Sequence, residues 1–208
     1  MRSLIMWKIP LEKDALEDMT TLAPTLSHRY FPRTAEWIRS LFLVILGSLL
    51  LAALAQVEIV LPFTPVPITS QTFGVLLVGA ALGSKRGAAS MVLYITEGAF
   101  GLPIFAGGAS GFGILTGATA GYLVGFIGAA YVVGWLAERG LERSVGTSLI
   151  PFIVGTIVIY ACGVTWLAIL LNDFSSAINA GLLPFLVGDA IKLMAASLAL
   201  PTAWKFVK

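Results

Sequence analysis

Long runs of apolar residues, separated by short polar segments, make up the chain from residue 40 onward. An apolar run of about 20 residues is long enough to cross the hydrocarbon core of a membrane as a helix. The pattern therefore predicts six spanning helices, over residues 40–57, 68–83, 87–100, 114–137, 147–171 and 182–204. The third run has 14 residues and reaches only about 21 Å as a helix, so its length alone is also compatible with a re-entrant segment.

Two of the connecting segments are too irregular for helix. Pro62, Pro65 and Pro67 fix three φ angles and remove three backbone donors, which predicts a stiff turn. Residues 101–113, with the sequence GLPIFAGGASGFG, are rich in glycine. Irregular backbone at membrane depth is tolerated only where it lines a cavity or is buried in protein. Both segments fall on the same side of the predicted bundle, so we expect irregular extracellular loops that cap a ligand pocket.

The composition supports an all-α integral membrane protein. Hydrophobic residues make up 58% of the chain and charged residues 12%, whereas soluble domains carry about 25% charged residues. We expect one membrane domain over 35–208, preceded by a polar extension over 1–34 in which residues 11–19 are compatible with a short interfacial helix. The single cysteine excludes internal disulfides, and the single histidine, His28, lies in the extension. We therefore expect no metal site, no cofactor and no enzyme activity in the membrane domain.

The positions of the basic residues predict the orientation. Six of the 13 Lys and Arg residues precede the first predicted helix, and all the others except Lys192 follow the second, fourth or sixth. With six crossings, every loop that carries Lys or Arg falls on one side, while the opposite loops hold Glu58, Glu97 and Asp173. By the positive-inside rule both termini are then cytoplasmic. This distribution also argues that the short third helix crosses the membrane.

Asp189 and Lys192 lie within the last apolar run. A charged residue at the centre of a membrane helix costs about 2.5–3.5 kcal/mol on insertion scales, and such residues usually mark functional sites. At spacing i and i+3 the two side chains lie on one helix face, about 10 Å or more from the predicted start of the helix and in the outer half of the membrane. The alternative is a structural ion pair, but we favour a ligand-binding pair.

Further candidate contacts are expected on the same outer side. The polar residues there are Thr69, Gln71, Tyr94 and Glu97, and a few polar groups that converge in an apolar cleft are typical of a ligand pocket. For Gln71 and Tyr94, ordinary hydrogen bonding between helices is an equal alternative.

The glycine-rich segment allows two interpretations. Gly107 and Gly108 supply the permissive backbone that a closing lid requires. Gly108-Ala109-Ser110-Gly111 also matches the GxSG pattern of intramembrane serine proteases, but the only histidine, His28, is far from it. A phosphate-binding GxxxxGK[ST] loop is absent from the sequence, so ATP hydrolysis by that route is excluded.

Four segments resemble one family closely: LPFTPVPITSQTFGVLLVGAALGSKRGA, LYITEGAFGLPIFAGG, GATAGYLVGF and PFLVGDAIK. They are similar to the BioY family, the biotin-binding S components of energy-coupling factor vitamin transporters, over residues 43–200. The resemblance implies six helices with a substrate pocket near the extracellular face, in a prokaryotic cytoplasmic membrane. Asp189 and Lys192 match the family motif and are implied to contact biotin.

The resemblance also implies partners. S components work with a transmembrane coupling subunit and two ATPase subunits, and Ser48 and Ala52 match the small-xxx-small motif that docks the coupling subunit. The resemblance favours an outward-facing strip at these two residues, and the alternative is that they pack against another helix of this chain. On this view Asp189 accepts from the ureido N–H of biotin, Lys192 donates to a ligand oxygen, and Phe105 and Tyr94 pack against the ring. The chain has Ala109 where some members have Arg, which leaves the partner of the biotin carboxylate open. The alternatives are an S component for another vitamin and a proton-coupled carrier that uses Asp189.

Overall fold

The computed structural model describes residues 21–205, so the predicted interfacial helix over 11–19 lies outside the described residues. The elements follow in the order α2 (Leu22–Tyr30), α3 (Glu36–Ala55), β1 (Glu58–Ile59), β2 (Ile68–Thr69), α4 (Gln71–Leu82), α5 (Ser84–Ala99), η1 (Ala106–Gly108), η2 (Phe112–Thr116), α6 (Ala120–Ala137), η3 (Leu141–Arg143), α7 (Val145–Leu171), α8 (Phe174–Gly181), η4 (Leu183–Phe185) and α9 (Leu186–Lys205).

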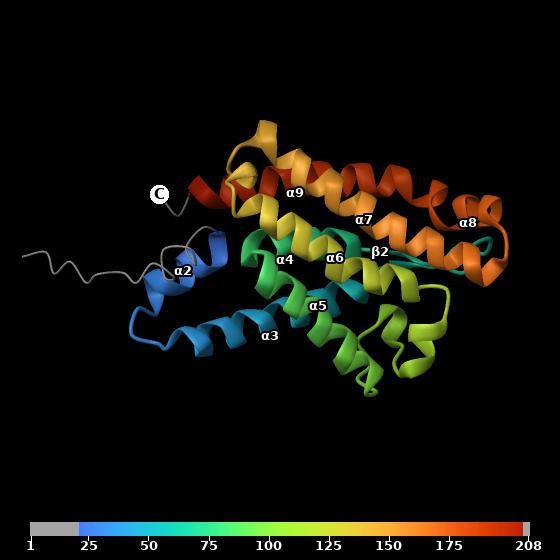
Figure 1. The fold of residues 1–208 in the computed structure, drawn as a ribbon, viewed down its shortest axis with the longest axis horizontal. Coiled ribbons are helices and arrows are strands. Elements are labelled where there is room, and N and C mark those ends of the chain that lie inside the picture. The colour runs from blue at the N-terminus through green and yellow to red at the C-terminus, as the bar shows by residue number, and fades with distance from the viewer. Residues whose placement is uncertain (1–20, 206–208) are drawn as a thin grey trace, which may run out of the picture.

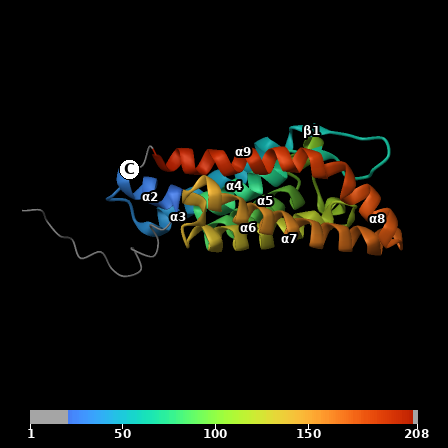
Figure 2. The ribbon, with the colours of Figure 1, turned by 90° about the horizontal axis from the view of Figure 1, so that it is seen from above.

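The long helices lie side by side along the long axis of the molecule, with α6 inside the bundle (Figures 1 and 2). Helix α6 packs against α4, α5 and α7, while α3 packs on α5, and α9 packs on α4 and α7. Helix α2 packs against α4, where Leu22 joins an apolar cluster with Leu76 and Ala80. The segment 21–34 therefore lies against the helix bundle, although the sequence assigned it to a polar extension.

Glycine allows several of these helices to approach closely. A Cβ atom on Gly79 would lie 2.7 Å from the backbone oxygen of Ala130, so α4 and α6 are in backbone contact. Where α4 turns into α5, the Glu138 side chain at the end of α6 accepts hydrogen bonds from Ser84 N at 2.7 Å and Ser84 Oγ at 2.8 Å. A carboxylate thus satisfies the first turn of α5 from a different helix, which suits the positive end of the helix dipole.

Four helices in the described part of the chain are long and apolar enough to cross a membrane: Glu36–Ala55, Ala120–Ala137, Val145–Leu171 and the continuous stretch Phe174–Lys205. Helices α4 and α5 are shorter, with 12 and 16 residues. The prediction of a helical, multi-pass membrane protein is confirmed. The count of six crossings stays a prediction.

Three predicted helix starts are wrong. The helix predicted from residue 114 starts at Ala120, because Phe112–Thr116 forms the separate 3-10 helix η2. The helix predicted from residue 68 starts at Gln71, because Ile68 and Thr69 pair with Glu58 and Ile59 in a two-stranded antiparallel ribbon. The helix predicted from residue 182 starts at Leu186. It is preceded by η4 and by α8, a short helix that the sequence analysis did not predict.

The later start of α9 changes the position of the charged pair. Asp189 lies in the first turn of α9 and not about 10 Å along it. Negatively charged side chains are common in the first turn of a helix, where they face the positive end of the helix dipole. The side chain of Asp173 caps α8 in a similar way, since it accepts from Ser175 N and Ser176 N.

The two ends of the bundle differ in charge. Apart from Lys192, the Lys and Arg residues within 21–205 lie between α2 and the start of α3, at the start of α5, around η3 and at the end of α9. These segments gather at the end of the molecule that holds α2 and the C-terminus, and the β-ribbon and α8 lie at the opposite end (Figure 1). The Arg143 guanidinium, 4.8 Å from the centre of the Trp204 ring, joins η3 to the end of α9 there.

Candidate functional site

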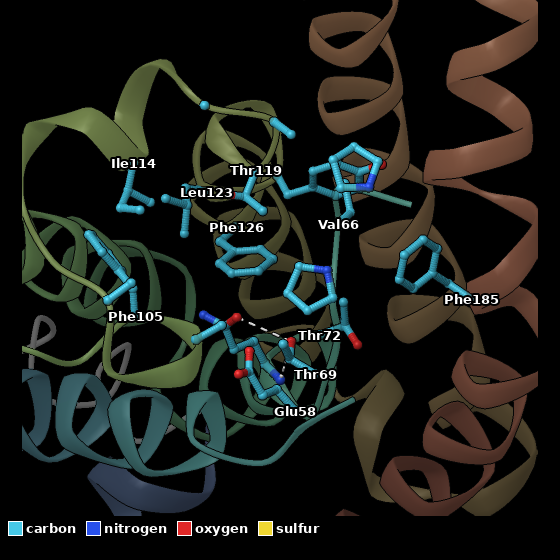
Figure 3. A pocket seen from close by; sticks show the side chains of 18 of the residues that line it. Glu58, Val66, Thr69, Thr72, Phe105, Ile114, Thr119, Leu123, Phe126 and Phe185 are labelled. Atoms are coloured by element: carbon cyan, nitrogen blue, oxygen red, sulfur yellow. Dashed lines mark hydrogen bonds between the residues drawn. The ribbon is translucent and has the colours of Figure 1, made fainter. Parts of the chain in front are cut away.

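A cavity of about 300 Å³ lies at the end of the bundle that holds the β-ribbon. Its walls come from the ribbon, α4, the segment between α5 and α6, and the helices α6, α7 and α9. The apolar wall includes Val66, Phe105, Ile114, Leu123, Phe126 and Phe185. Figure 3 shows Glu58, Thr69 and Thr72 together on one side of the cavity, below Phe126. This combination of an apolar wall and one polar side is typical of a small-molecule site.

The polar side is organised around Asp189, which is 4% exposed. One carboxylate oxygen, Oδ1, accepts from Lys192 Nζ at 2.8 Å and from Thr72 Oγ1 at 3.2 Å. The other, Oδ2, accepts from the Tyr160 hydroxyl at 2.6 Å. Three elements, α4, α7 and α9, therefore meet at one buried carboxylate, which the ammonium of Lys192 balances in charge.

Lys192 uses all its donors in the same network. An ammonium group has three N–H donors and no acceptor. Besides Asp189, Lys192 Nζ contacts the backbone oxygen of Thr69 at 2.7 Å and Thr72 Oγ1 at 3.1 Å. Both Asp189 and Lys192 line the cavity, and their contact with a ligand stays a prediction. A ligand atom that accepts from Lys192 must replace one of its three present partners.

Gln71 and Phe105 also line the cavity, but Tyr94 does not. Tyr94 is fully buried behind them: its hydroxyl accepts from Gln71 Nε2 at 2.8 Å and donates to Ile104 O at 3.1 Å. Its ring stands edge-on to Phe105 with 5.4 Å between the ring centroids. Tyr94 thus lies behind the cavity wall, and its predicted contact with the ligand stays a prediction. Tyr94 positions two residues that do line the cavity.

Gly107 and Gly108 are near the cavity but are not part of its wall, to which Ala106 and Ala109 contribute instead. Both glycines have positive φ, at 65° and 72°, so the predicted need for permissive backbone is confirmed. A Cβ atom on Gly107 would lie 2.5 Å from Glu58 Oε1, which leaves no room for a side chain there.

Ser48 and Ala52 face the interior of the bundle. Ser48 is fully buried and donates to Glu97 Oε2 at 2.6 Å, and Ala52 is 8% exposed. The predicted outward-facing docking strip is therefore wrong, because the polar partner of Ser48 lies on α5. The outward face of α3 is made instead by large apolar residues at helical spacing, Leu41, Phe42, Ile45, Leu46, Leu49 and Leu50.

The sequence analysis missed Thr72, Tyr160 and Glu58 as cavity residues. Thr72 lies three residues after Thr69, which was already a candidate. In a helix this spacing puts two residues on one face, so the sequence could have predicted Thr72 as a neighbour of Thr69. Tyr160 stands alone in a long apolar run, and nothing near it in sequence indicates a partner. Glu58 was assigned to an outer loop, but its neighbours across the ribbon are not apparent from the sequence.

The site contains no arrangement suited to catalysis or to metal binding. Within residues 21–205 no three His, Cys, Asp or Glu side chains group as a metal site. Instead, buried hydrogen-bonding groups face an apolar cavity inside a bundle with membrane-length helices. These features define a membrane-embedded binding protein for a small, partly polar molecule.

The family follows from comparison with known proteins. The sequence matches the BioY family over residues 20–208. This chain belongs to the BioY family. The match begins closer to the N-terminus than the resemblance over residues 43–200 and includes α2.

Individual relatives agree with this assignment. The chain is 39% identical over 168 residues to a biotin transporter BioY of Rhizobium etli, which covers 77% of this chain and 90% of the relative. It is 42% identical over 138 residues to a biotin transporter BioY of Thermotoga maritima, with coverage of 66% and 80%. A crystal structure of the S-component for biotin from an ECF-type ABC transporter has the same fold, with a TM-score of 0.74 and 24% identity over 82% of this chain and 93% of that one.

Proposed function

We propose that this chain is the biotin-binding S subunit of an energy-coupling factor transporter and not an enzyme. The observation that carries the proposal is the buried Asp189–Lys192 network on one side of an otherwise apolar cavity. Relatives that are 39% and 42% identical are named biotin transporters, which supports biotin as the ligand.

The chemistry of biotin fits the two sides of the cavity. Its ureido group offers two N–H donors and one carbonyl acceptor, and its fused rings are largely apolar. The Asp189 carboxylate has about four acceptor positions and three present donors, so it can accept one ureido N–H directly. Lys192 donates to a ligand oxygen after it releases Thr69 O or Thr72 Oγ1.

The apolar part of the ligand packs against aromatic residues. Phe105, Phe126 and Phe185 come from three different segments and line the same cavity (Figure 3). Aromatic side chains provide large contact areas with few degrees of freedom to restrict. Tyr94 holds Phe105 from behind and so acts on the ligand through it.

The segment with Gly107 and Gly108 acts as the lid. It links α5 to the cavity wall, and its positive-φ glycines give the backbone freedom that closure requires. Replacing both glycines with Ala is expected to change biotin association and dissociation rates. Both replacements are strained because both glycines have positive φ, so the rates are read together with the thermal unfolding of each variant.

The proposal includes the membrane arrangement and the partners. Helices α3, α4, α5, α6, α7 and α9 make six crossings of a prokaryotic cytoplasmic membrane, with both termini in the cytoplasm and the cavity on the outer side. The domain over 35–208 binds substrate. A transmembrane coupling subunit and two ATPases provide the energy, since the sequence has no GxxxxGK[ST] loop of its own.

Binding of labelled biotin to the purified chain tests the proposal. Wild type is expected to bind, whereas Asp189→Asn and Lys192→Met are expected to lose several kcal/mol of binding, because each leaves a buried charge without its partner. Asp173→Asn, which changes a carboxylate outside the cavity, is the matched control. Thermal unfolding of each variant separates lost binding from lost fold. Absence of biotin binding by folded wild-type protein would refute the proposal.

Binding and transport assays separate the proposal from its two alternatives, an S component for another vitamin and a proton-coupled carrier. A panel of vitamins identifies an S component with another ligand. Uptake that persists without any ATPase and stops with an uncoupler indicates a proton-coupled carrier. The proposed S subunit requires the ATPases for uptake but not for binding.

A further inference from the structure

The contacts proposed for the ureido group of biotin leave one of its donors without a partner. A cyclic urea presents N–H, C=O and N–H in that order along one edge. In the proposed complex Asp189 accepts one N–H and Lys192 donates to the carbonyl. A second N–H that enters the cavity without an acceptor would lose the hydrogen bond that it made in water, which weakens binding. A complete site therefore needs a further acceptor beside Lys192.

Glu58 is an acceptor with open positions. Its side chain lines the cavity, and within residues 21–205 neither a hydrogen bond nor an ion pair joins its carboxylate to another group. A carboxylate can accept at about four positions. The other carboxylate of the cavity wall, Asp189, already has three donors. Glu58 therefore offers more free acceptor positions to a ligand than Asp189 does.

The neutral polar side chains of the wall are less suited to this contact. Those that already take part in hydrogen bonds are Thr69, Gln71, Thr72, Tyr122 and Tyr160. The hydroxyl of Thr119 makes no such bond within the described residues, but Figure 3 shows Thr119 on the other side of the Phe126 ring from Glu58. On the polar side of the cavity, the free acceptor is thus Glu58.

The β-ribbon places Glu58 close to the charged pair. Glu58 pairs with Thr69 across the ribbon, and neighbouring strands lie about 4.7–4.9 Å apart. The backbone oxygen of the same Thr69 accepts from Lys192 Nζ at 2.7 Å, and Lys192 Nζ lies 2.8 Å from Asp189 Oδ1. Figure 3 shows Glu58 beside Thr69 and Thr72 at the cavity. The polar side thus presents a carboxylate, an ammonium and a second carboxylate, which complements the order N–H, C=O and N–H.

We propose that Glu58 accepts the second ureido N–H of biotin, so that two carboxylates with an ammonium between them recognise the ureido edge. This inference rests on the proposed function, because it takes the ureido group as the part of the ligand that the polar side holds. Hydrogen bonds to an ionised acceptor are stronger than those between neutral groups. Glu58 therefore distinguishes a urea with both N–H groups from an analogue that lacks one, because the analogue leaves the carboxylate without a donor.

Two variants at Glu58 test the contact in the purified full-length chain. Glu58→Gln keeps an oxygen acceptor and the size of the side chain but removes the charge, and Glu58→Met removes the acceptor as well. We expect the dissociation constant of biotin to rise about tenfold or more in Glu58→Met, and by less in Glu58→Gln. Thermal unfolding of each variant is measured in parallel, so that lost binding is separated from lost fold.

Two analogues of biotin make the test specific for the ureido group. In each analogue a methyl group replaces the hydrogen of one ureido nitrogen, N1′ or N3′, so that a single N–H remains. The analogue methylated on the nitrogen that faces Glu58 has no N–H to give, so wild type and Glu58→Met should bind it with similar dissociation constants. The other analogue should respond to Glu58→Met as biotin does. All three probes carry the same carboxylate tail, so this difference reports only the ureido contact.

Ile59→Gln is the matched control. Ile59 is the next residue of β1, and successive side chains of a strand point to opposite faces. Its side chain is 60% exposed and is not part of the cavity wall. This variant changes the same strand without touching the proposed contact, so it is expected to keep the wild-type dissociation constants for all three probes.

The outcomes distinguish the inference from the proposed function. Wild-type affinity for biotin in a folded Glu58→Met protein would overturn the inference and leave the proposed function intact. An equal change for all three probes would also overturn it, because Glu58 would then act on a part of the ligand that they share. Loss of fold in both variants would overturn it too, since Glu58 would then support the ribbon. If folded wild type does not bind biotin, the inference and the proposed function fail together.

Discussion

Asp189 is a charged residue with three donors around it, provided by Lys192, Thr72 and Tyr160. Burial of a lone carboxylate is costly, but a carboxylate that is paired and hydrogen-bonded avoids most of that cost. The network therefore explains how this residue can be 4% exposed at the wall of a mostly apolar cavity. It also makes each partner of Asp189 a contributor to stability.

Tyr160 is the partner whose removal is simplest to interpret. Tyr160→Phe deletes the 2.6 Å hydrogen bond to Asp189 and leaves the ring in place. Hydrogen bonds to charged groups contribute about 1.5–3 kcal/mol, so we expect a loss of about that size in unfolding free energy. Denaturation of the purified protein in detergent measures it. Tyr131→Phe, at a tyrosine that is 48% exposed, is expected to change little; equal losses in both variants would contradict this role of Tyr160.

A second buried carboxylate lies at the opposite end of the molecule. Glu142 is fully buried; its Oε1 accepts from Trp204 Nε1 at 3.1 Å and lies 3.6 Å from Arg143 Nε. Its Oε2 is buried without a hydrogen-bond partner among the described residues. Burial raises the pKa of Glu142, against the opposing effects of its hydrogen bonds and of Arg143.

The raised pKa of Glu142 predicts a pH dependence of stability. The folded state holds this proton to higher pH than the unfolded state, whose glutamate pKa is about 4.3. The contribution of Glu142 is therefore most favourable below about pH 4.3 and is lost as pH rises through the folded pKa. Melting curves over this range should show a shallower decline with pH in Glu142→Gln than in wild type.

Glu36→Gln provides the control for that experiment. Its side chain is 53% exposed and lies 4.0 Å from Arg86. Glu36→Gln removes one negative charge, as Glu142→Gln does, but from an exposed position. The dependence of its stability on pH should therefore follow that of wild type. If Glu142→Gln also follows wild type, the proton on Glu142 has no part in stability.

At the level of single residues, the sequence identified those whose chemistry is unusual for a membrane helix. Asp189 and Lys192 stood out because charge is rare in an apolar run, and both line the cavity. Thr72 and Tyr160 did not, because hydroxyl groups are common in such helices and only their contacts reveal a role. Sequence also did not show that Tyr94 lies behind Gln71 and Phe105, since it does not separate a wall residue from the residue behind it.

Among the elements, helix interiors were easier to predict than helix ends. Residues 174–185 look like a linker followed by continuous helix, but Asp173 caps a separate short helix and Leu182 leaves helical geometry. Hydropathy alone cannot show that break, because the whole stretch Phe174–Lys205 is apolar enough on average to cross a membrane. The small residues of α3 illustrate a related limit: Ser48 and Ala52 predict close packing correctly, but spacing does not say against which helix.

The inward orientation of Ala52 predicts the outcome of Ala52→Trp. With Ala52 8% exposed inside the bundle, the indole must displace core side chains, so we expect at least about 1–3 kcal/mol of destabilisation together with weaker biotin binding. Leu49→Trp, at a position 55% exposed on the same helix, is expected to preserve both. Thermal unfolding and labelled-biotin binding decide; a stable Ala52→Trp protein with normal binding would show that Ala52 faces outward.

For the whole molecule, the segregation of charge predicts orientation in the membrane. The ribbon end has Phe63, which is 68% exposed, and the basic end has Ser144, which is also exposed. In a Cys162→Ala background, an impermeant thiol reagent applied to intact cells should label Phe63→Cys and not Ser144→Cys. Permeabilised cells should label both. The reverse pattern would place the cavity on the cytoplasmic side.

The saturation of Lys192 determines what a ligand must exchange in order to bind. Every N–H of its ammonium already has an oxygen partner, so an arriving ligand exchanges bonds and does not add to them. A molecule of the right shape that lacks the matching carbonyl would break a contact and offer none in return. The contacts of Lys192 thus form a closed set, against which every candidate ligand competes. Discrimination then comes from the failure of near-matches to replace what they disrupt, more than from a strong attraction to the correct molecule.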